Sequence, residues 1–221
     1  MRLLAVLTCG ALLGSGAPAQ AQTAATASAP DAQRGYAAVD AAATFGNSSS
    51  QSYGGEVGVT VAPGWQLFVE GGHINNAATA ALATAAQAIA GGLGQTQSGV
   101  GVSAKEPVAF GDAGVRYLVP VSSTSVLPYV MAGIGAARVT QDATFTIGGA
   151  DVTSSLAQYG VQLGTDLSGR FTKPLLVLGG GVTVPVWSRV LIDLHYRYGR
   201  IFAADQGINV SRAGIGMGVR F

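Results

Sequence analysis

The sequence predicts an all-β fold: an eight-stranded antiparallel transmembrane β-barrel with short periplasmic turns and longer outer loops. The 221 residues are 48% hydrophobic but only 10% charged, whereas soluble domains carry about 25% charged residues. No segment after the first 21 residues offers the ~18 consecutive apolar residues that a membrane-spanning helix needs. Because only helices and closed barrels satisfy their backbone in lipid, a barrel is favoured. The 33 glycines suit tight bends and crowded barrel walls.

Residues 1–21 have the three-part order of a secretory signal peptide. Arg2 supplies the basic region, an apolar run follows, and Ala19-Gln20-Ala21 forms a small-residue cleavage site. We therefore expect a signal peptide at 1–21, a flexible lead at 22–33 and the barrel at 34–221. The only cysteine, Cys9, lies in the signal, so the mature part has no thiol chemistry. Removing Arg2 leaves 11 basic against 11 acidic residues, which gives no reason to expect nucleic acid as a partner.

Eight segments have the length and residue types of membrane strands, which need about 9–11 residues each. They are 34–45, 53–61, 66–74, 108–119, 126–139, 174–184, 189–201 and 210–221. Three tight connections, rich in Pro, Gly or Ser, lie at 62–65, 120–125 and 185–188. They alternate with the connections at 46–52, 75–107, 140–173 and 202–209. This alternation is typical of outer-membrane barrels and predicts that the tight turns face the periplasm.

The longest connections contain stretches whose structure the sequence leaves open. Residues 77–90 are rich in alanine, which favours a short helix. Thr79, Thr84 and Gln87 interrupt the apolar run, so the alternatives are an outer-loop helix and a disordered segment. Residues 151–163 have the same ambiguity.

Alternating side chains carry the assignment of a membrane barrel, in which apolar residues face lipid and polar or small ones face the lumen. In the last strand one face holds Ala213, Ile215, Met217, Val219 and Phe221, and the other holds Arg212, Gly214, Gly216, Gly218 and Arg220. The fifth and sixth strands are rich in Val, Ala and Gly on both faces, so their phase stays unassigned. A soluble barrel is the alternative, with the apolar face inside.

The inward set contains both charge signs. It comprises the acids Asp40, Glu56, Glu70, Asp112 and Asp193, the bases Arg116, Arg197, Arg212 and Arg220, and His195. The interior of an eight-stranded barrel is just wide enough for side chains to fill. We therefore expect a structural network of ion pairs that plugs the lumen. Arg212 and Arg220 are expected nearer the rims, in contact with water.

Aromatic residues gather near the predicted strand ends, as expected of girdles at the two water–lipid boundaries. One level should contain Trp65, Trp187, Tyr117, Tyr129 and Phe221, and the other Phe45, Tyr53, Tyr198 and Phe202.

Three stretches resemble the family of small outer-membrane β-barrels that includes opacity-type surface antigens and the barrel part of outer membrane protein A. They are the Asp-x-x-Tyr-Arg-Tyr pattern at 193–198, the Pro-Tyr-x-x-x-Gly-x-Gly pattern at 128–135, and the C-terminal hexapeptide 216–221. In the last, Gly216, Val219 and Phe221 match the signal that the barrel assembly machinery reads in this family. The resemblance implies the fold, the bacterial outer membrane as location, and outer-membrane lipid and the assembly machinery as partners.

The sequence shows no catalytic, cofactor or metal site. His73 and His195 have no Cys or His neighbour at metal-ligand spacing. Lipid A deacylases have a similar fold and use a His-x-Ser arrangement, but the corresponding step from His195 reaches Arg197. We therefore expect a structural or surface-interaction barrel whose loops bind an extracellular ligand, and no enzyme. The alternatives are a narrow channel or hydrophobic-solute transporter and, third, a lipid A-modifying enzyme.

Overall fold

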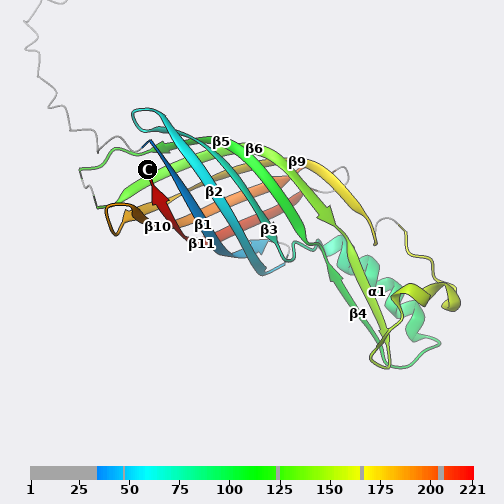
Figure 1. The fold of residues 1–221 in the computed structure, drawn as a ribbon. Helices are drawn as coiled ribbons and strands as arrows, with labels where there is room; N and C mark the ends of the chain where they lie inside the picture. Colours follow the sequence, from blue (N-terminus) through cyan, green and yellow to red (C-terminus); the bar gives the residue numbers. More distant parts are fainter. Residues whose placement is uncertain (1–33, 47, 123–124, 165–166, 204–206) are drawn as a thin grey trace, which may run out of the picture.

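The computed structural model describes residues 34–221 apart from 47, 123–124, 165–166 and 204–206. The expected signal peptide and lead fall before the described residues. The described chain forms a closed antiparallel barrel of eight strands in the order β1-β11-β10-β9-β6-β5-β3-β2, which confirms the predicted fold class (Figure 1). These strands are β1 Gly35–Gly46, β2 Ser50–Ala62, β3 Trp65–Ile74, β5 Val108–Leu118, β6 Leu127–Thr140, β9 Arg170–Pro185, β10 Val190–Ile201 and β11 Ile208–Arg220.

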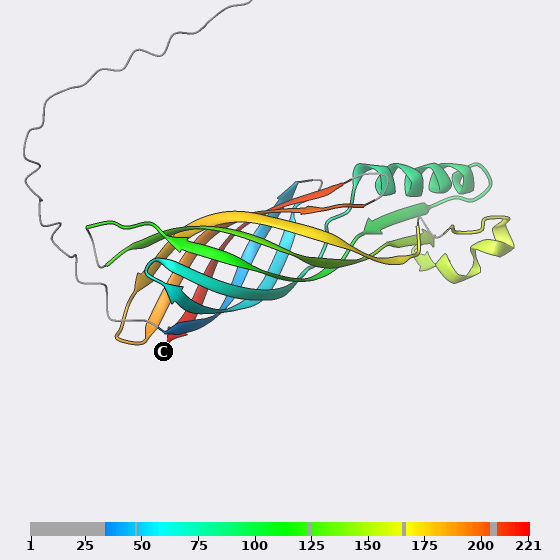
Figure 2. The same cartoon turned by 90° about the horizontal axis from the view of Figure 1, so that it is seen from above.

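The two ends of the barrel differ. The turn end carries the connections β2–β3, β5–β6 and β9–β10, of which β2–β3 is a two-residue turn with Gly64 at a φ of 77°. The start of β1 meets the end of the chain there, because Gly35 N–H donates to the carbonyl of Phe221 over 2.9 Å. The loop end carries the other connections, including the two long ones (Figure 2).

The outer surface of the barrel is apolar. Its most exposed large side chains include Ile134, Val39 and Val69, at 73%, 68% and 63% exposure. A soluble barrel would have its apolar face inside and its polar face outside, which is the reverse of this arrangement. The structure also assigns the phase that the sequence leaves open: Tyr129 and Met131 of β6, and Leu175 and Val177 of β9, point inward and are buried.

The two long connections fold together into an outer domain at the loop end. It consists of α1 Ala80–Gly94, the three-stranded sheet β4 Val100–Lys105, β7 Asp142–Ile147 and β8 Ala150–Asp151, and the 3-10 helix η1 Thr153–Tyr159. The helix alternative for 77–90 is therefore confirmed, while the three short strands were not predicted. Their buried side chains pack on α1 in a core that includes Leu82, Leu93, Phe145 and Leu156. No helix in the described ranges has the length and apolar character to cross a membrane.

A buried polar joint connects this outer domain to the barrel. The Glu106 carboxylate is 1% exposed and accepts a hydrogen bond of 2.7 Å from the backbone N–H of Thr79, the N-cap of α1. Gln141, between β6 and β7, donates to its other oxygen over 3.4 Å. The Asn76 side-chain oxygen accepts from the backbone N–H groups of Ala78 and Glu106. The joint therefore fixes where α1 begins relative to the strand ends.

Candidate functional site

Three acidic side chains lie next to one another in the lumen. Glu56, Glu70 and Asp112 are direct register neighbours on β2, β3 and β5, and each is at most 4% exposed. Like charges on directly opposing residues are destabilising, and burial adds a desolvation cost. This row therefore requires cations from the other side of the barrel.

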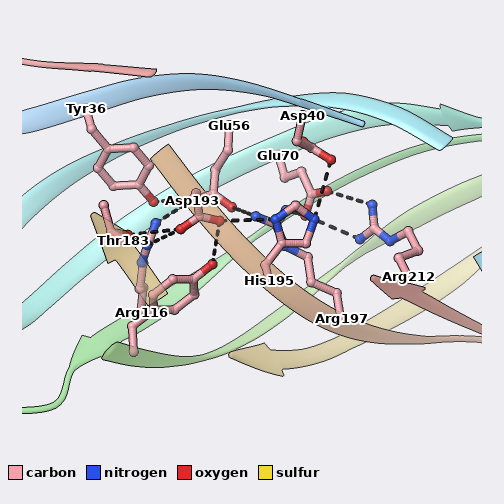
Figure 3. Close-up of polar contacts among 11 residues, drawn as sticks. Tyr36, Asp40, Glu56, Glu70, Arg116, Thr183, Asp193, His195, Arg197 and Arg212 are labelled. Carbon is pink, nitrogen blue, oxygen red and sulfur yellow. Dashed lines mark hydrogen bonds and ion pairs between the residues drawn. The ribbon is translucent and has the colours of Figure 1, made fainter. Parts of the chain in front are cut away.

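Two arginines from β10 and β11 supply those cations (Figure 3). Arg197 places its guanidinium 2.7 Å from a Glu70 oxygen and 3.0 Å from a Glu56 oxygen. Arg212 donates to both oxygens of Glu70, over 2.7 and 3.4 Å. The flat fork of arginine suits such shared contacts with carboxylates. Glu70 thus lies between two arginines across the lumen.

Arg116 forms a second centre nearer the turn end. Its guanidinium donates to Glu56 and Asp193, each over 3.1 Å, and to the hydroxyl of Thr183 over 2.6 Å. It also lies over the Tyr129 ring, 3.4 Å from the centroid. The hydroxyls of Tyr129 and Tyr36 donate to Asp193 and Glu56, respectively. Tyrosine hydroxyls therefore join the arginine as hydrogen-bond donors to the carboxylates at this end of the network.

His195 lies between two carboxylates. Its Nδ1 is 3.1 Å from an Asp193 oxygen, and its Nε2 is 3.6 Å from an Asp40 oxygen. Asp112 is different, because neither of its oxygens has a hydrogen-bond partner among the described residues. Asp112 lies in the lumen as parity indicates, but it takes no part in the ion pairs.

Above this network, toward the loop end, the lumen is mainly apolar, with the buried hydroxyls of Thr44 and Ser52 at its edge. A cluster that includes Ile74, Val108, Phe110, Val139 and Val177 fills it, with every member below 9% exposed. Arg212 joins the two layers, since its guanidinium lies 4.4 Å from the centroid of the Phe110 ring. The sequence did not predict an apolar upper layer, because the inward residues of β6 and β9 could not be assigned.

Little free space remains along the barrel axis. One cavity of about 30 Å³ lies beside the ion pairs, and another of about 20 Å³ lies in the apolar layer. A buried water needs about 10–15 Å³ by this measure, so each cavity has room for one or two waters at most. Glycines make room for the inward side chains: a Cβ at Gly181 of β9 would lie 2.7 Å from the hydroxyl of Tyr129, its register neighbour on β6. Neither cavity amounts to an open path for hydrated ions.

Two residues lie elsewhere than the sequence indicates. Arg212 is 4% exposed and ion-paired, so the expectation of a rim position in water is wrong for it. Arg220, in contrast, lies at the turn end as expected of a rim residue, where it donates to the carbonyl of Ser188 over 2.7 Å. Tyr129 faces the lumen instead of the aromatic girdle. Trp65 and Tyr117 do pair at the turn end, with ring centroids 4.8 Å apart.

Sequence reasoning missed three members of the network: Tyr36, Tyr129 and Thr183. Tyr36 has the same parity as Asp40 on β1, so this signal was available. Tyr129 and Thr183 lie on β6 and β9, whose alternation the sequence does not show.

The remaining predicted residues have simple positions. His73 is exposed on the lipid side of β3. No cluster of three or more His, Cys, Asp or Glu side chains suited to a metal ion occurs among the residues described. In the last strand Gly216 faces the lumen, Val219 faces outward at 50% exposure, and the Phe221 N–H donates to the Gly35 carbonyl over 3.0 Å.

Comparisons with known proteins agree with this architecture. The crystal structure of Neisserial surface protein A is 18% identical, with 85% of this chain and 97% of that chain covered and a TM-score of 0.56. A major outer membrane protein from Thermus thermophilus is 11% identical, with coverages of 85% and 99% and a TM-score of 0.51. The N-terminal β-barrel domain of Pseudomonas aeruginosa OprF is 14% identical, with coverages of 84% and 97% and a TM-score of 0.46. No curated protein sequence matches the chain.

The family model for the outer membrane protein beta-barrel domain matches residues 7–221, which is nearly the whole chain. This match agrees with the closed eight-stranded barrel and its apolar outer face. The chain belongs to the outer membrane protein β-barrel domain family and is a bacterial outer-membrane protein.

Proposed function

We propose that this protein is a closed, non-conducting barrel that displays its outer domain at the cell surface for interaction with an extracellular ligand. The observation that carries the proposal is the filled lumen: an ion-paired layer and an apolar layer lie one above the other. An interior packed in this way supports a structural scaffold rather than a pore. The folded loops at one end supply the surface that the scaffold displays.

The orientation follows from the lengths of the connections. Outer-membrane barrels have short turns on the periplasmic side and longer loops outside. The two connections that build the outer domain are by far the longest in the barrel. We therefore place the loop end outside and the turn end in the periplasm. This leaves the C-terminal residues Gly216, Val219 and Phe221 on the side where the barrel assembly machinery would read them.

Single-channel recording tests the closed lumen. The protein, purified from membranes and shown to be folded by its heat-dependent mobility, is inserted into planar bilayers. We expect no stable openings, because ion-paired and apolar side chains fill the lumen. Stable openings of large conductance would overturn the proposal and favour the channel.

Epitope tags test the orientation. One tag is inserted between Gly148 and Gly149, in the turn between β7 and β8, where both residues have positive φ and open space where a Cβ would lie. The matched control carries the tag after Ser188, in the β9–β10 turn. Antibody should label intact cells only with the first tag. Labelling of the Ser188 tag alone would invert the orientation.

A further inference from the structure

Two arginines lie together on the outward face of the barrel near the loop end. Arg138 of β6 pairs in register with Thr172 of β9, and Arg170 lies two residues further along β9 on the same face. Diagonal neighbours of this kind lie about 7–8 Å apart, within reach of two long side chains. Both arginines are exposed.

Two other basic residues of the loop end contact aromatic rings, which these two arginines do not. Lys173 lies over the Phe171 ring and Arg200 lies over the Phe202 ring. Lys105 is the register neighbour of the acidic Asp142 on β7. Among the described residues, no carboxylate, hydrogen-bond acceptor or ring contacts the Arg138 or Arg170 side chain. Two like charges side by side at a lipid boundary are unfavourable without an anion.

A strip of small side chains lies directly below the arginines on the lipid side. It consists of Ala109, Gly111 and Ala113 on β5, which we call the β5 strip. Ala109 is the register neighbour of Arg138, and Gly111 lies between Gly71 of β3 and Ala136 of β6. The strongly exposed Val69 and Ile134 stand on its two sides, next to Ala113 in register.

Packing inside the protein does not require glycine at Gly111 of this strip or at its register neighbour Gly71 of β3. A Cβ at Gly111 would meet only the Glu70 carbonyl oxygen, at 3.8 Å, and one at Gly71 would meet only that of Phe110, at 3.7 Å. In contrast, a Cβ at Gly214, on the lumen side, would lie 2.6 Å from the Ala41 carbonyl oxygen. A partner outside the barrel would explain why the surface at Gly71 and Gly111 is flat.

We propose that Arg138 and Arg170 bind the phosphate of a phosphorylated lipid in the outer leaflet, whose acyl chains lie along the β5 strip. Arginine binds phosphate through paired, charge-assisted hydrogen bonds, which neutralises the arginine pair. The flat β5 strip allows extended acyl chains to approach the strands closely. The arginines would thus bind the phosphate, and the strip would bind the acyl chains, of the same lipid. The assignment to the outer leaflet rests on the orientation proposed above.

Native mass spectrometry with diphosphorylated lipid A as the probe tests the proposal on protein purified from membranes. We expect the wild-type protein to retain the lipid, and the Arg138→Gln/Arg170→Gln variant to bind it about tenfold or more weakly. The matched control, Arg34→Gln/Arg189→Gln, removes two exposed arginines at the turn end and should bind as the wild type does. Equal binding by both variants, or an equal loss in both, would overturn the proposal.

Three further arms separate the parts of the ligand and the site. Lipid A without its phosphates should bind as weakly as the Arg138/Arg170 variant. Millimolar inorganic phosphate should not displace the diphosphorylated lipid, and complete displacement would mean that the arginines recognise a free anion and not a lipid. Gly111→Leu should weaken binding of the lipid, whereas Ala41→Leu, on the lipid side of β1, should not. Equal effects of these two variants would remove the role of the strip.

In detergent the probe reaches both ends of the barrel, so the mass-spectrometric result does not depend on the orientation. If the lipid binds but the tag at Ser188 labels on intact cells, the arginine site stands and the leaflet is the inner one. If the tags behave as expected but both arginine variants bind the lipid equally, the orientation stands and the lipid site fails.

Discussion

At the scale of single residues, Arg197 is the cation on which most of the buried acid row depends. It is 2% exposed and contacts both Glu56 and Glu70, two carboxylates that are register neighbours. Removing one partner of a buried ion pair leaves an uncompensated charge in a poorly solvated place. Arg197 therefore stabilises the fold both through its two ion pairs and by reducing the repulsion between Glu56 and Glu70.

We predict that Arg197→Ala lowers the free energy of unfolding in bilayers by roughly 3–5 kcal/mol. Urea titration of the protein in lipid vesicles measures this. Arg220→Ala is the control, because Arg220 bonds only the Ser188 carbonyl near the surface, and its loss should cost about 1 kcal/mol. If the two variants unfold at the same urea concentration, the lumen pairs contribute little to stability.

Glu106 makes the outer domain sensitive to pH. Burial raises the pKa of Glu106 above its ordinary value of 4.5, although hydrogen bonds from Thr79 and Gln141 oppose this shift. The folded state disfavours the ionised form of Glu106. Below the ordinary pKa, Glu106 is protonated in both states and does not change the free energy of unfolding. As the pH rises from there through the raised pKa, the free energy of unfolding falls.

We therefore predict that the outer domain melts at a lower temperature at neutral pH than at mildly acidic pH. The measurement is the loss of the NMR signals of Phe145, which is fully buried in the outer-domain core. Glu106→Gln keeps an oxygen for the Thr79 N–H and should remove the part of the pH dependence that Glu106 causes. A pH dependence unchanged in Glu106→Gln would assign it to other groups.

The positions of many individual side chains could be predicted, since alternation alone places Asp40, Glu56, Glu70, Arg116 and Asp193 in the lumen. Their partners could not be predicted, because pairing across the lumen depends on strand tilt and on close approach. Arg212 shows this: parity gives its face, but only the shear of the barrel brings it to Glu70, 142 residues away. Asp112 has the same parity as Glu70 and finds no cation among the described residues.

At the scale of elements, the strength of the alternation decides what the sequence reveals. β11 shows it plainly and was assigned correctly, whereas β6 and β9 carry apolar or small residues on both faces. They do so because their inward residues build the apolar upper layer, including Ala137, Val139 and Val177. β9 also begins at Arg170, earlier than predicted, because β6 pairs with it along its whole length as far as Thr140.

The lipid face of β11 gives a direct test of strand phase. Ile215 is 55% exposed on the outer surface, so we predict that Ile215→Arg lowers the free energy of unfolding by about 2–4 kcal/mol in bilayers. Phe45→Arg lies on the same face of neighbouring β1 but near the loop end. Burying its charge should therefore lower the free energy of unfolding by only about 0–1 kcal/mol. Equal stability of both variants would mean that Ile215 does not face the middle of the bilayer.

At the scale of the whole molecule, two hydrophobic clusters are separate. One fills the upper lumen, the other builds the outer domain, and they share no residue. The sequence predicts the barrel because membrane strands follow a period of two. It does not predict β4, β7 and β8, because these strands have only two to six residues and are held by pairing with one another and by the core that β4 and β7 share with α1.

This separation predicts that the barrel folds without its outer domain. Ile74 and Val108 are register partners at the ends of β3 and β5, and Thr140 and Arg170 are partners at the ends of β6 and β9. A two-residue Asn-Gly turn can therefore replace 75–107 and another can replace 141–169. The barrel should lose about 1 kcal/mol, chiefly from removal of Ala77, which packs on the upper layer.

Heat-dependent mobility and urea unfolding in vesicles measure the outcome. The Arg138 and Arg170 side chains remain in the shortened protein, so it should still retain diphosphorylated lipid A while it loses the displayed surface. That combination would separate the lipid site on the barrel wall from the surface role of the loops. A shortened protein that does not assemble would show instead that the two clusters fold as one unit, with Glu106 and Asn76 as their necessary connection.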